Sequence, residues 1–286
     1  MTVDVIQVSD LHVTEAGDVF GQDARVALDL IFADVDARGL DPDLVVATGD
    51  LAHHGEAESY AWLHERFAAL DVPVHCLAGN HDLAAPFAER RPGANVHAVP
   101  STDVDGWRFV FLDSNALGRE VHDDGTVHDR DERVHRAHSG ELLPDDARWF
   151  SEFLAGPEAG PVMVWLHHPP VAHPLAAALE ARPFTQWLME EFSRSGRVRG
   201  VSAGHLHSAF DAERAGVGYW TCPSGWLGLD FDARTMAPPG YRHFRFHPDG
   251  AIESTAYWVD DVRYAERPPF PDWVLKVLAG DDIISE

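Results

Sequence analysis

The amino-acid sequence predicts an α/β fold. Two observations carry this prediction: short apolar runs rich in β-branched residues alternate with stretches of helical spacing, and the last part of the chain has mostly the pattern of strands. Such alternation is typical of a sheet whose strands are connected through helices. The 286 residues contain no internal repeat and no break in composition. We therefore expect one domain over residues 1–265, followed by a C-terminal arm at 266–286.

The first part of the chain alternates regularly between strand and helix. Val26 and Leu30 recur at helical spacing after a β-branched opening run, and Tyr60, Leu63 and Phe67 share one face of a second helix. The apolar runs between these helices end in Gly-Asp and Gly-Asn. The expected elements are, in order, strand 3–8, helix 22–38, strand 43–50, helix 56–70 and strand 72–80.

The same alternation continues through the middle of the chain. Pro144 stands near the start of a helix, where proline is favoured, and Pro169 and Pro170 end a strand. The elements expected here are strand 107–114, helix 144–154, strand 161–170, helix 183–195 and strand 198–207. Beyond them the runs GYWTCPS, YRHFRFHP and AIESTAYWV favour strands, and one short helix is expected after Pro271.

The chain is strongly acidic, with a formal net charge of −25 at pH 7. A surface of this charge repels nucleic acid, so we expect no nucleic-acid polymer as a partner. No apolar run is long enough for a membrane span, and the start MTVDVIQVSDLH lacks the basic and apolar regions of a signal peptide. Cys76 and Cys222 are expected to be reduced core thiols. We expect a cytoplasmic protein.

Five predicted strands end in side chains that bind metals. The side chains are Asp10 and His12, Asp50, Asn80 with His81, His167, and His205 with His207. In open α/β sheets, ligands bind beyond the carboxyl ends of the strands, so the five segments can converge on one place. Gly49, Gly79 and Gly204 leave room for tight backbone turns beside these side chains.

The donor types indicate a site for two metal ions. The set offers carboxylate, imidazole and one amide oxygen without a thiolate, which suits Mn, Fe, Zn or Co. A single Asp or His at a strand end is usually a helix cap or a solvated loop residue. Seven ligands together exceed the needs of one tetrahedral ion and fit two ions that share a bridging carboxylate.

The motifs resemble those of the calcineurin-like metallophosphoesterases. They are Asp10-Leu-His12, Gly49-Asp50, Gly79-Asn80-His81-Asp82, His167-His168 and Gly204-His205-Leu206-His207, and they occur in the family's order over about residues 1–250. The runs GDLAHHGEAESY, FLDSN and PPGYRHFRF look most like the bacterial class III cyclic nucleotide phosphodiesterases. The resemblance implies a four-layer α-β-β-α sandwich, in which two mixed sheets are flanked by helices.

The resemblance also implies a role for each residue. Asp10, His12 and His207 would hold the first metal, Asn80, His167 and His205 the second, and Asp50 would bridge both. His81 would not be a ligand but would face the substrate and protonate the leaving oxygen, oriented by Asp82. Asn80, His81 and His168 are the expected substrate-binding residues. The other histidines, such as His53 and His54, are expected to be surface or strand residues, and Trp226 to belong to the core or to border the pocket.

The resulting functional hypothesis is a phosphoesterase with two divalent metals, Mn or Fe first and Zn, Co or Mg as alternatives. Its expected substrates are small phosphodiesters such as 3′,5′-cyclic nucleotides, attacked by a hydroxide held between the metals. Alternatives are a phosphomonoesterase, a hydrolase of nucleotide-sugar or phospholipid-headgroup bonds, and a metal-bound sensor or scaffold without turnover. We expect no membrane span, and a homodimer is one expected assembly.

The segment 119–139 is an insertion of about twenty residues that interrupts the alternation. Only Val121, Val127 and Val134 are apolar and large, so the segment can bury little surface. One hypothesis is a flap over the active site that brings His122, His128, His135 or His138 to the substrate. The alternative is a solvated surface insertion.

Overall fold

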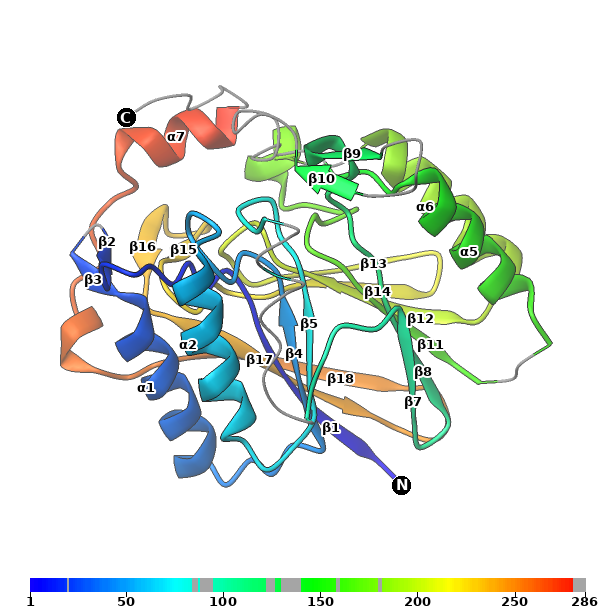
Figure 1. The fold of residues 1–286 in the computed structure, drawn as a ribbon, viewed down its shortest axis with the longest axis horizontal. Helices are drawn as coiled ribbons and strands as arrows, with labels where there is room; N and C mark the ends of the chain where they lie inside the picture. The colour runs from blue at the N-terminus through cyan, green and yellow to red at the C-terminus, as the bar shows by residue number, and fades with distance from the viewer. Residues whose placement is uncertain are drawn as a thin grey trace.

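A computed structural model describes residues 1–19, 21–83, 87, 95–121, 127–129, 140–157, 160–179 and 182–279. Two six-stranded sheets face each other, with helices on the outer face of each sheet (Figure 1). The expected four-layer sandwich of two mixed sheets is confirmed. Within the described residues, no helix has the length and apolar character that a membrane crossing requires.

The first sheet has the strand order β18-β17-β1-β4-β5-β6. Its strands are β1 (Val3–Val8), β4 (Leu44–Thr48), β5 (Val74–Leu77), β6 (Val96–His97), β17 (Gly240–Phe246) and β18 (Ile252–Trp258). Strands β1, β4, β5 and β6 run parallel, β17 pairs antiparallel with β1, and β18 pairs antiparallel with β17. Helices α1 (Ala24–Ala37) and α2 (Ala57–Ala68) connect the parallel strands. Asp23 caps α1 by accepting hydrogen bonds from the N–H groups of Arg25 and Val26.

The second sheet has the order β13-β14-β12-β11-β8-β7. Its strands are β7 (Ser101–Val104), β8 (Trp107–Phe111), β11 (Val162–Trp165), β12 (Val198–Ala203), β13 (Phe210–Arg214) and β14 (Val217–Thr221). Strands β8, β11, β12 and β14 are parallel. Helices α5 (Pro144–Ala155) and α6 (Arg182–Ser195) cover its outer face.

Shorter elements connect these layers. They are the strand pairs β2 (Asp18–Val19) with β3 (Gln22–Asp23), β9 (Arg119–Val121) with β10 (Val127–Asp129) and β15 (Gly228–Asp230) with β16 (Thr235–Ala237), the 3-10 turns η1 (Ala116–Gly118), η2 (Pro174–Leu179) and η3 (Val262–Tyr264), and helix α7 (Asp272–Ala279). Helix α7 starts directly after Pro271, as expected.

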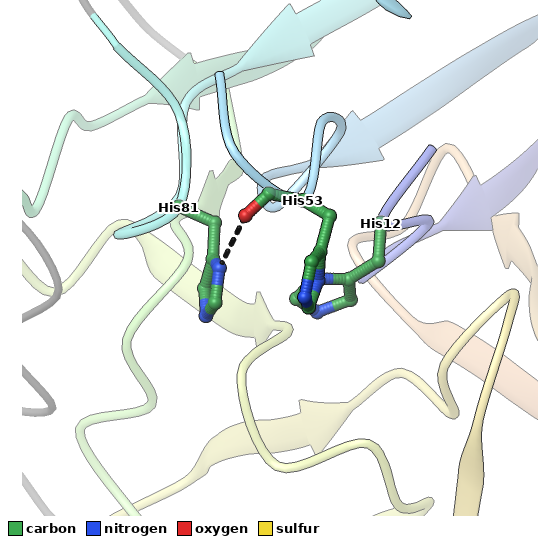
Figure 2. A group of neighbouring side chains, drawn as sticks. All are labelled: His12, His53 and His81. Carbon is green, nitrogen blue, oxygen red and sulfur yellow. Dashed lines mark hydrogen bonds between the residues drawn. The ribbon is translucent and has the colours of Figure 1, made fainter. Parts of the chain in front are cut away.

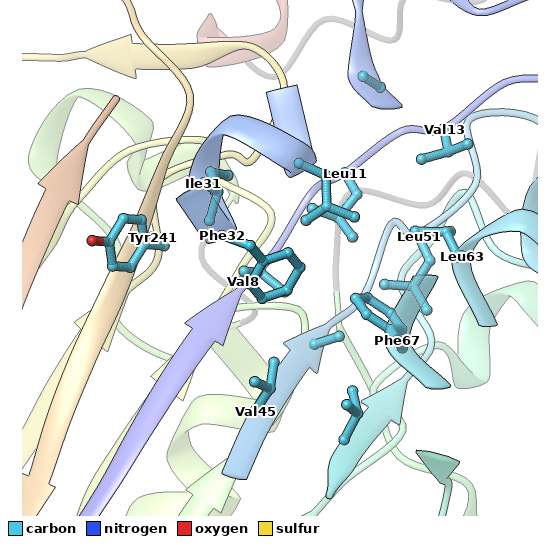
Figure 3. Close-up of a cluster of buried hydrophobic side chains, with 14 of the residues drawn as sticks. Val8, Leu11, Val13, Ile31, Phe32, Val45, Leu51, Leu63, Phe67 and Tyr241 are labelled. Atoms are coloured by element: carbon cyan, nitrogen blue, oxygen red, sulfur yellow. The ribbon is translucent and has the colours of Figure 1, made fainter. Parts of the chain in front are cut away.

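Alternation along β1 distributes its side chains between two cores. Val3 and Val5 belong to the core between the sheets, whereas Ile6 and Val8 belong to the core under α1 and α2 (Figure 3). Aromatic side chains dominate the layer between the sheets, where Trp165 packs edge-on against Phe244 at a centroid distance of 5.4 Å. The strands β1, β4, β5, β11 and β12 are therefore rigid supports for the loops that follow them.

The insertion 119–139 is described only in part. Its described residues form β9 and β10. His122, His135 and His138 lie outside the described residues, and the side chain of His128 is also not described. The flap stays a prediction.

Candidate metal centre

The seven side chains expected to bind metals lie together at one edge of the sandwich. Asp10, His12, Asp50 and Asn80 follow strands β1, β4 and β5 of the first sheet, and His167, His205 and His207 follow β11 and β12 of the second. Because these strands are parallel within each sheet, their carboxyl ends meet at the same edge. Each sheet thus supplies part of the donor set.

Buried leucines between the polar residues hold the loops in place. Leu11 lies between Asp10 and His12, Leu51 follows Asp50, and both leucines are fully buried in the core under α1 and α2 (Figure 3). The N–H of His12 donates to the carbonyl of Asp50 at 2.8 Å, which joins the two loops. Because each leucine points into this core, the neighbouring polar side chain points away from it.

Most of the expected ligands have left-handed backbone conformations. Among the described residues, eight residues other than glycine have positive φ, and five of these are expected ligands. The five are Asp10 (φ 53°), His12 (48°), Asp50 (50°), His205 (70°) and His207 (54°). Such a conformation costs roughly 1–2 kcal/mol for a residue with a Cβ, and it persists where the surroundings enforce it. Strain concentrated on these residues is typical of a functional site.

Gly204 allows the two sheets to approach at this edge. A Cβ at this position would lie 2.0 Å from the hydroxyl of Ser9 and 2.7 Å from Oδ2 of Asp10. Both carboxylate oxygens of Asp10 accept the N–H of His205, at 2.9 and 3.0 Å. The glycine expected from the sequence thus permits a direct link between the loop after β1 and the loop after β12.

The first group of donors consists of Asp10, His12, Asp50 and His207. The Nε2 atoms of His12 and His207 are 3.1 Å apart. Oδ2 of Asp50 is 3.5 Å from Nε2 of His12, and Oδ1 of Asp10 is 3.5 Å from Nε2 of His207. The four side chains surround one point.

The second group lies on the other side of Asp50. Oδ1 of Asp50 is 3.4 Å from Nε2 of His167, which also lies 3.0 Å from Oδ1 of Asn80 and 3.2 Å from Nδ1 of His205. The two carboxylate oxygens of Asp50 therefore face different groups of donors, which is the arrangement that a bridging carboxylate needs.

Hydrogen bonds at the far side of the rings fix which nitrogen faces each group. Nδ1 of His207 lies 2.9 Å from the carbonyl of Leu227, and Nδ1 of His167 lies 2.9 Å from the carbonyl of Thr48. A carbonyl only accepts, so each Nδ1 carries the hydrogen and a neutral ring turns the lone pair of Nε2 toward the carboxylates. Acceptor atoms converge in both groups. Bound cations offset the repulsion between these atoms. The residues present therefore fit two divalent ions.

The electrostatics of the protein agree with this fit. Burial raises the pKa of Asp10. Burial and the neighbouring His81 hold the pKa of His12 well below its usual value, so that ring is neutral. Burial would also lower the pKa of His167, but Asp50 raises it to about 9. Without a metal, a proton on His167 thus supplies part of the positive charge that the carboxylates require.

A sequence profile of the calcineurin-like phosphoesterases matches residues 3–209. The chain belongs to this family. It is a metal-dependent hydrolase of phosphate esters.

Similar proteins agree with the assignment of this phosphoesterase. A probable cyclic nucleotide phosphodiesterase of Synechococcus is 28% identical over 264 residues, which are 91% of this chain and 94% of the relative. A 3′,5′-cyclic adenosine monophosphate phosphodiesterase of Pseudomonas aeruginosa is 28% identical over 269 residues, 90% of each chain. The crystal structure of a dimetal phosphatase from Danio rerio shares the fold, with a TM-score of 0.59 and 16% identity over 90% of this chain and 99% of that one.

In the phosphoesterase, His81 borders the cavity beside the ligands. Its N–H donates to Oδ1 of Asp50 at 2.9 Å, and its Nδ1 donates to the carbonyl of His53 at 2.8 Å (Figure 2). The side chain of His53 also contacts a ligand, because its Nδ1 lies 3.1 Å from Nδ1 of His12. His53 was expected to be a surface or strand residue. Its position three residues after Asp50, in the same loop, is the signal that could have identified it.

Asp82 binds the backbone of the ligand loops, and its expected orientation of His81 stays a prediction. Its buried carboxylate accepts hydrogen bonds from the N–H groups of Leu51, Ala52 and Gly79 and from the hydroxyl of Tyr60. These bonds join the loops after β4 and β5, whereas Nδ1 of His81 donates its hydrogen bond to the carbonyl of His53. Asp82 therefore holds the loop that carries Asn80 and His81.

His168 lies beside His167 and His205 of the second group, with ligand atoms of the three histidines within 4.8 Å of one another. It is buried, its Nδ1 is 2.8 Å from the hydroxyl of Ser114, and its ring centroid is 4.7 Å from that of His205. Asn80 and His81 border the cavity, and His168 does not. Contact of His168 with substrate stays a prediction.

Proposed function

We propose that this phosphoesterase hydrolyses phosphodiesters, with 3′,5′-cyclic nucleotides as the preferred class. The observation that carries the proposal is the two-sided donor set around Asp50, completed by a histidine, His81, that borders the same cavity. A sensor or scaffold would not need that histidine. The two relatives described above, similar over nine-tenths of the chain, bear the names of cyclic nucleotide phosphodiesterases.

The metals proposed are Mn and Fe. Asp10, His12 and His207 would hold one ion, Asn80, His167 and His205 the other, and Asp50 both. Imidazole, carboxylate and amide donors without a thiolate suit these ions, and they suit Zn and Co as well. When bound, the two ions supply Lewis-acid activation of water and neutralise charge on the phosphate.

His81 is proposed to handle the proton of the leaving alcohol. Its Nδ1–H is engaged by the carbonyl of His53, so Nε2 is the atom that can donate to an oxygen in the cavity (Figure 2). Its own N–H holds Oδ1 of Asp50, which ties the position of the acid to that of the bridging carboxylate. The acid and the metal ligands thus keep a constant separation.

The strong acidity of the chain supports small substrates of low charge. A diester carries one negative charge and a monoester up to two. A protein with a net charge of −25 therefore repels a diester less strongly than a monoester. A nucleic-acid polymer would meet the greatest repulsion. The homodimer and the cytoplasmic location stay predictions.

The proposal is tested with paired substrates that share a leaving group. With Mn(II) added, we expect kcat/KM for bis-p-nitrophenyl phosphate to exceed that for p-nitrophenyl phosphate, and 3′,5′-cyclic AMP to be hydrolysed. The Asp50→Ala variant, purified in the same way, measures contaminating phosphatase. A higher kcat/KM for the monoester would instead support a phosphomonoesterase.

A further inference from the structure

Helix α7 forms one side of the cavity that contains the metal ligands. Trp273, Val274 and Leu278 of α7 line this cavity together with Trp226 and Leu229. We call these five side chains the apolar wall. The other lining residues are Leu206 and the polar residues of the metal centre, so the cavity has one apolar and one polar side.

The apolar wall is anchored to a ligand loop. Val274 is 1% exposed and shares a buried cluster with Leu206, Phe231 and Phe270. Leu206 stands between the ligands His205 and His207. The packing of α7 and the position of this ligand loop therefore depend on the same core.

Aromatic contacts continue from the wall to the metal ligands. The ring of Trp226 lies 5.1 Å from that of His12 and 5.6 Å from that of His53, measured between centroids. A group bound against Trp226 is thus separated from the expected ligand His12 only by the ring of Trp226. Tryptophan favours planar partners, through stacking and edge contacts.

The wall lies outside the part of the chain that the family profile matches. The family profile ends at residue 209, whereas the wall residues lie between 226 and 278. The matched part contains all the expected metal ligands and His81. The chemistry common to a fold and the substrate specificity of its members are often carried by different residues.

The size of the cavity limits what can bind there. Its volume is about 150 Å³, and an apolar cavity of about 150 Å³ accommodates a benzene-sized group. The cavity can therefore hold one ring of this size beside the wall.

We propose that the apolar wall binds a planar aromatic group of the substrate, carried on an ester oxygen, and thereby selects aryl and nucleoside phosphodiesters over aliphatic ones. This inference rests on the proposed function, because it assigns the organic part of the same substrate. Trp273 and Leu278 are specificity-determining residues in this view, since they belong to α7 and bind no metal.

The test measures binding of two phosphonates that no phosphoesterase can hydrolyse at the P–C bond. Calorimetry compares phenylphosphonate with methylphosphonate on the metal-loaded protein. We expect the phenyl compound to bind about tenfold or more tightly than the methyl compound, from buried ring area and aromatic contact. In Trp273→Leu this advantage should fall at least about threefold, while the affinity for methylphosphonate stays unchanged.

Two further variants keep the test decisive. Leu278→Ala should reduce the advantage in the same direction, and it replaces Trp273→Leu if that variant does not fold. Lys276→Ala changes an exposed residue of α7 outside the cavity and should keep the wild-type ratio. Equal loss for both phosphonates, or an unchanged ratio in both wall variants, would overturn the inference. Failure to hydrolyse diesters with the phenyl preference intact would overturn only the proposed function.

Discussion

His53 connects the metal-binding and the acid-base parts of the site through two different atoms. Its ring contacts Nδ1 of His12, and its carbonyl accepts the hydrogen of Nδ1 of His81 (Figure 2). If Nε2 of His12 binds a metal, Nδ1 of that neutral ring carries the hydrogen and donates to His53. A side-chain acceptor at position 53 should therefore orient the ligand.

The first prediction separates this acceptor from the rest of the residue. His53→Leu keeps the carbonyl but removes the acceptor, so metal affinity should fall about 10- to 100-fold. His53→Asn places an amide oxygen near the position of Nδ1 and should restore most of the affinity. Titration with Mn(II) under calorimetry measures both. Equal affinities for His53→Leu and wild type would show that His12 does not depend on this contact.

The second prediction concerns His81, which borders the cavity without belonging to the expected ligands. His81→Ala should retain two metal equivalents and lose about two to four orders of magnitude in kcat. The loss should be smaller for p-nitrophenyl esters, because a leaving group of low pKa needs less protonation. Mass spectrometry of the metals and kinetics with two leaving groups test both statements. A variant that loses a metal would identify His81 as a ligand.

At the scale of single residues, the sequence predicts which expected donors converge better than it predicts the contacts of their neighbours. Asp10, Asp50 and His205 stand at strand ends whose motifs are local, so their convergence follows from parallel strands. The function of His53 depends on which ring lies across from it, which no local pattern contains. The same holds for Asp82, whose four hydrogen-bond donors come from three separate segments.

The loops after the strands are the elements on which the metal centre depends. The loop after β12 approaches the loop after β1 at Gly204, where a Cβ would overlap Ser9 and Asp10. The loops after β1 and β4 are joined by hydrogen bonds of their backbones. Positions of the ligands are thus set by backbone packing before any metal binds.

The third prediction tests this packing. Gly204→Ala should displace Asp10, reduce metal content below two equivalents and destabilise the protein by roughly 1–3 kcal/mol, because the added methyl meets a closely packed surface. Gly156→Ala is the control: it lies at the end of α5, and its Cβ would meet no atom closer than 3.2 Å. Metal analysis and thermal unfolding compare the two. Full metal content in Gly204→Ala would contradict the packing described.

Helix α7 shows which part of its structure the sequence pattern predicts and which part it does not. Pro271 and the spacing of apolar residues predict a short helix, and that helix is present. The sequence places it in an arm, whereas the structure packs its buried residue Val274 against Leu206 of the ligand loop. Amphipathic spacing indicates that a face is buried but not which surface covers it.

The two sheets of the molecule share one metal centre. Donors from the first sheet and donors from the second meet at one edge, while the aromatic core holds the sheets together elsewhere. A bound metal pair would therefore cross-link the two halves of the sandwich. Ligands that bind only the folded state stabilise it, by about 2.7 kcal/mol at 100 times their Kd.

The fourth prediction follows for the whole molecule. Removal of the metals by a chelator should lower Tm by roughly 5–10 °C, and Mn(II) should restore it. His81→Ala should show the same shift as wild type, because His81 is not a ligand. Unchanged melting after the metals are lost would mean that the centre does not contribute to holding the sheets together.

The left-handed backbone at the ligands implies that stability and activity compete in this enzyme. Asp10, His12, Asp50, His205 and His207 hold conformations that glycine adopts without strain. A library selected only for thermal tolerance of the metal-free protein should therefore accumulate glycine or asparagine at these five positions. A library selected for turnover should retain the native side chains and accept the lower melting point.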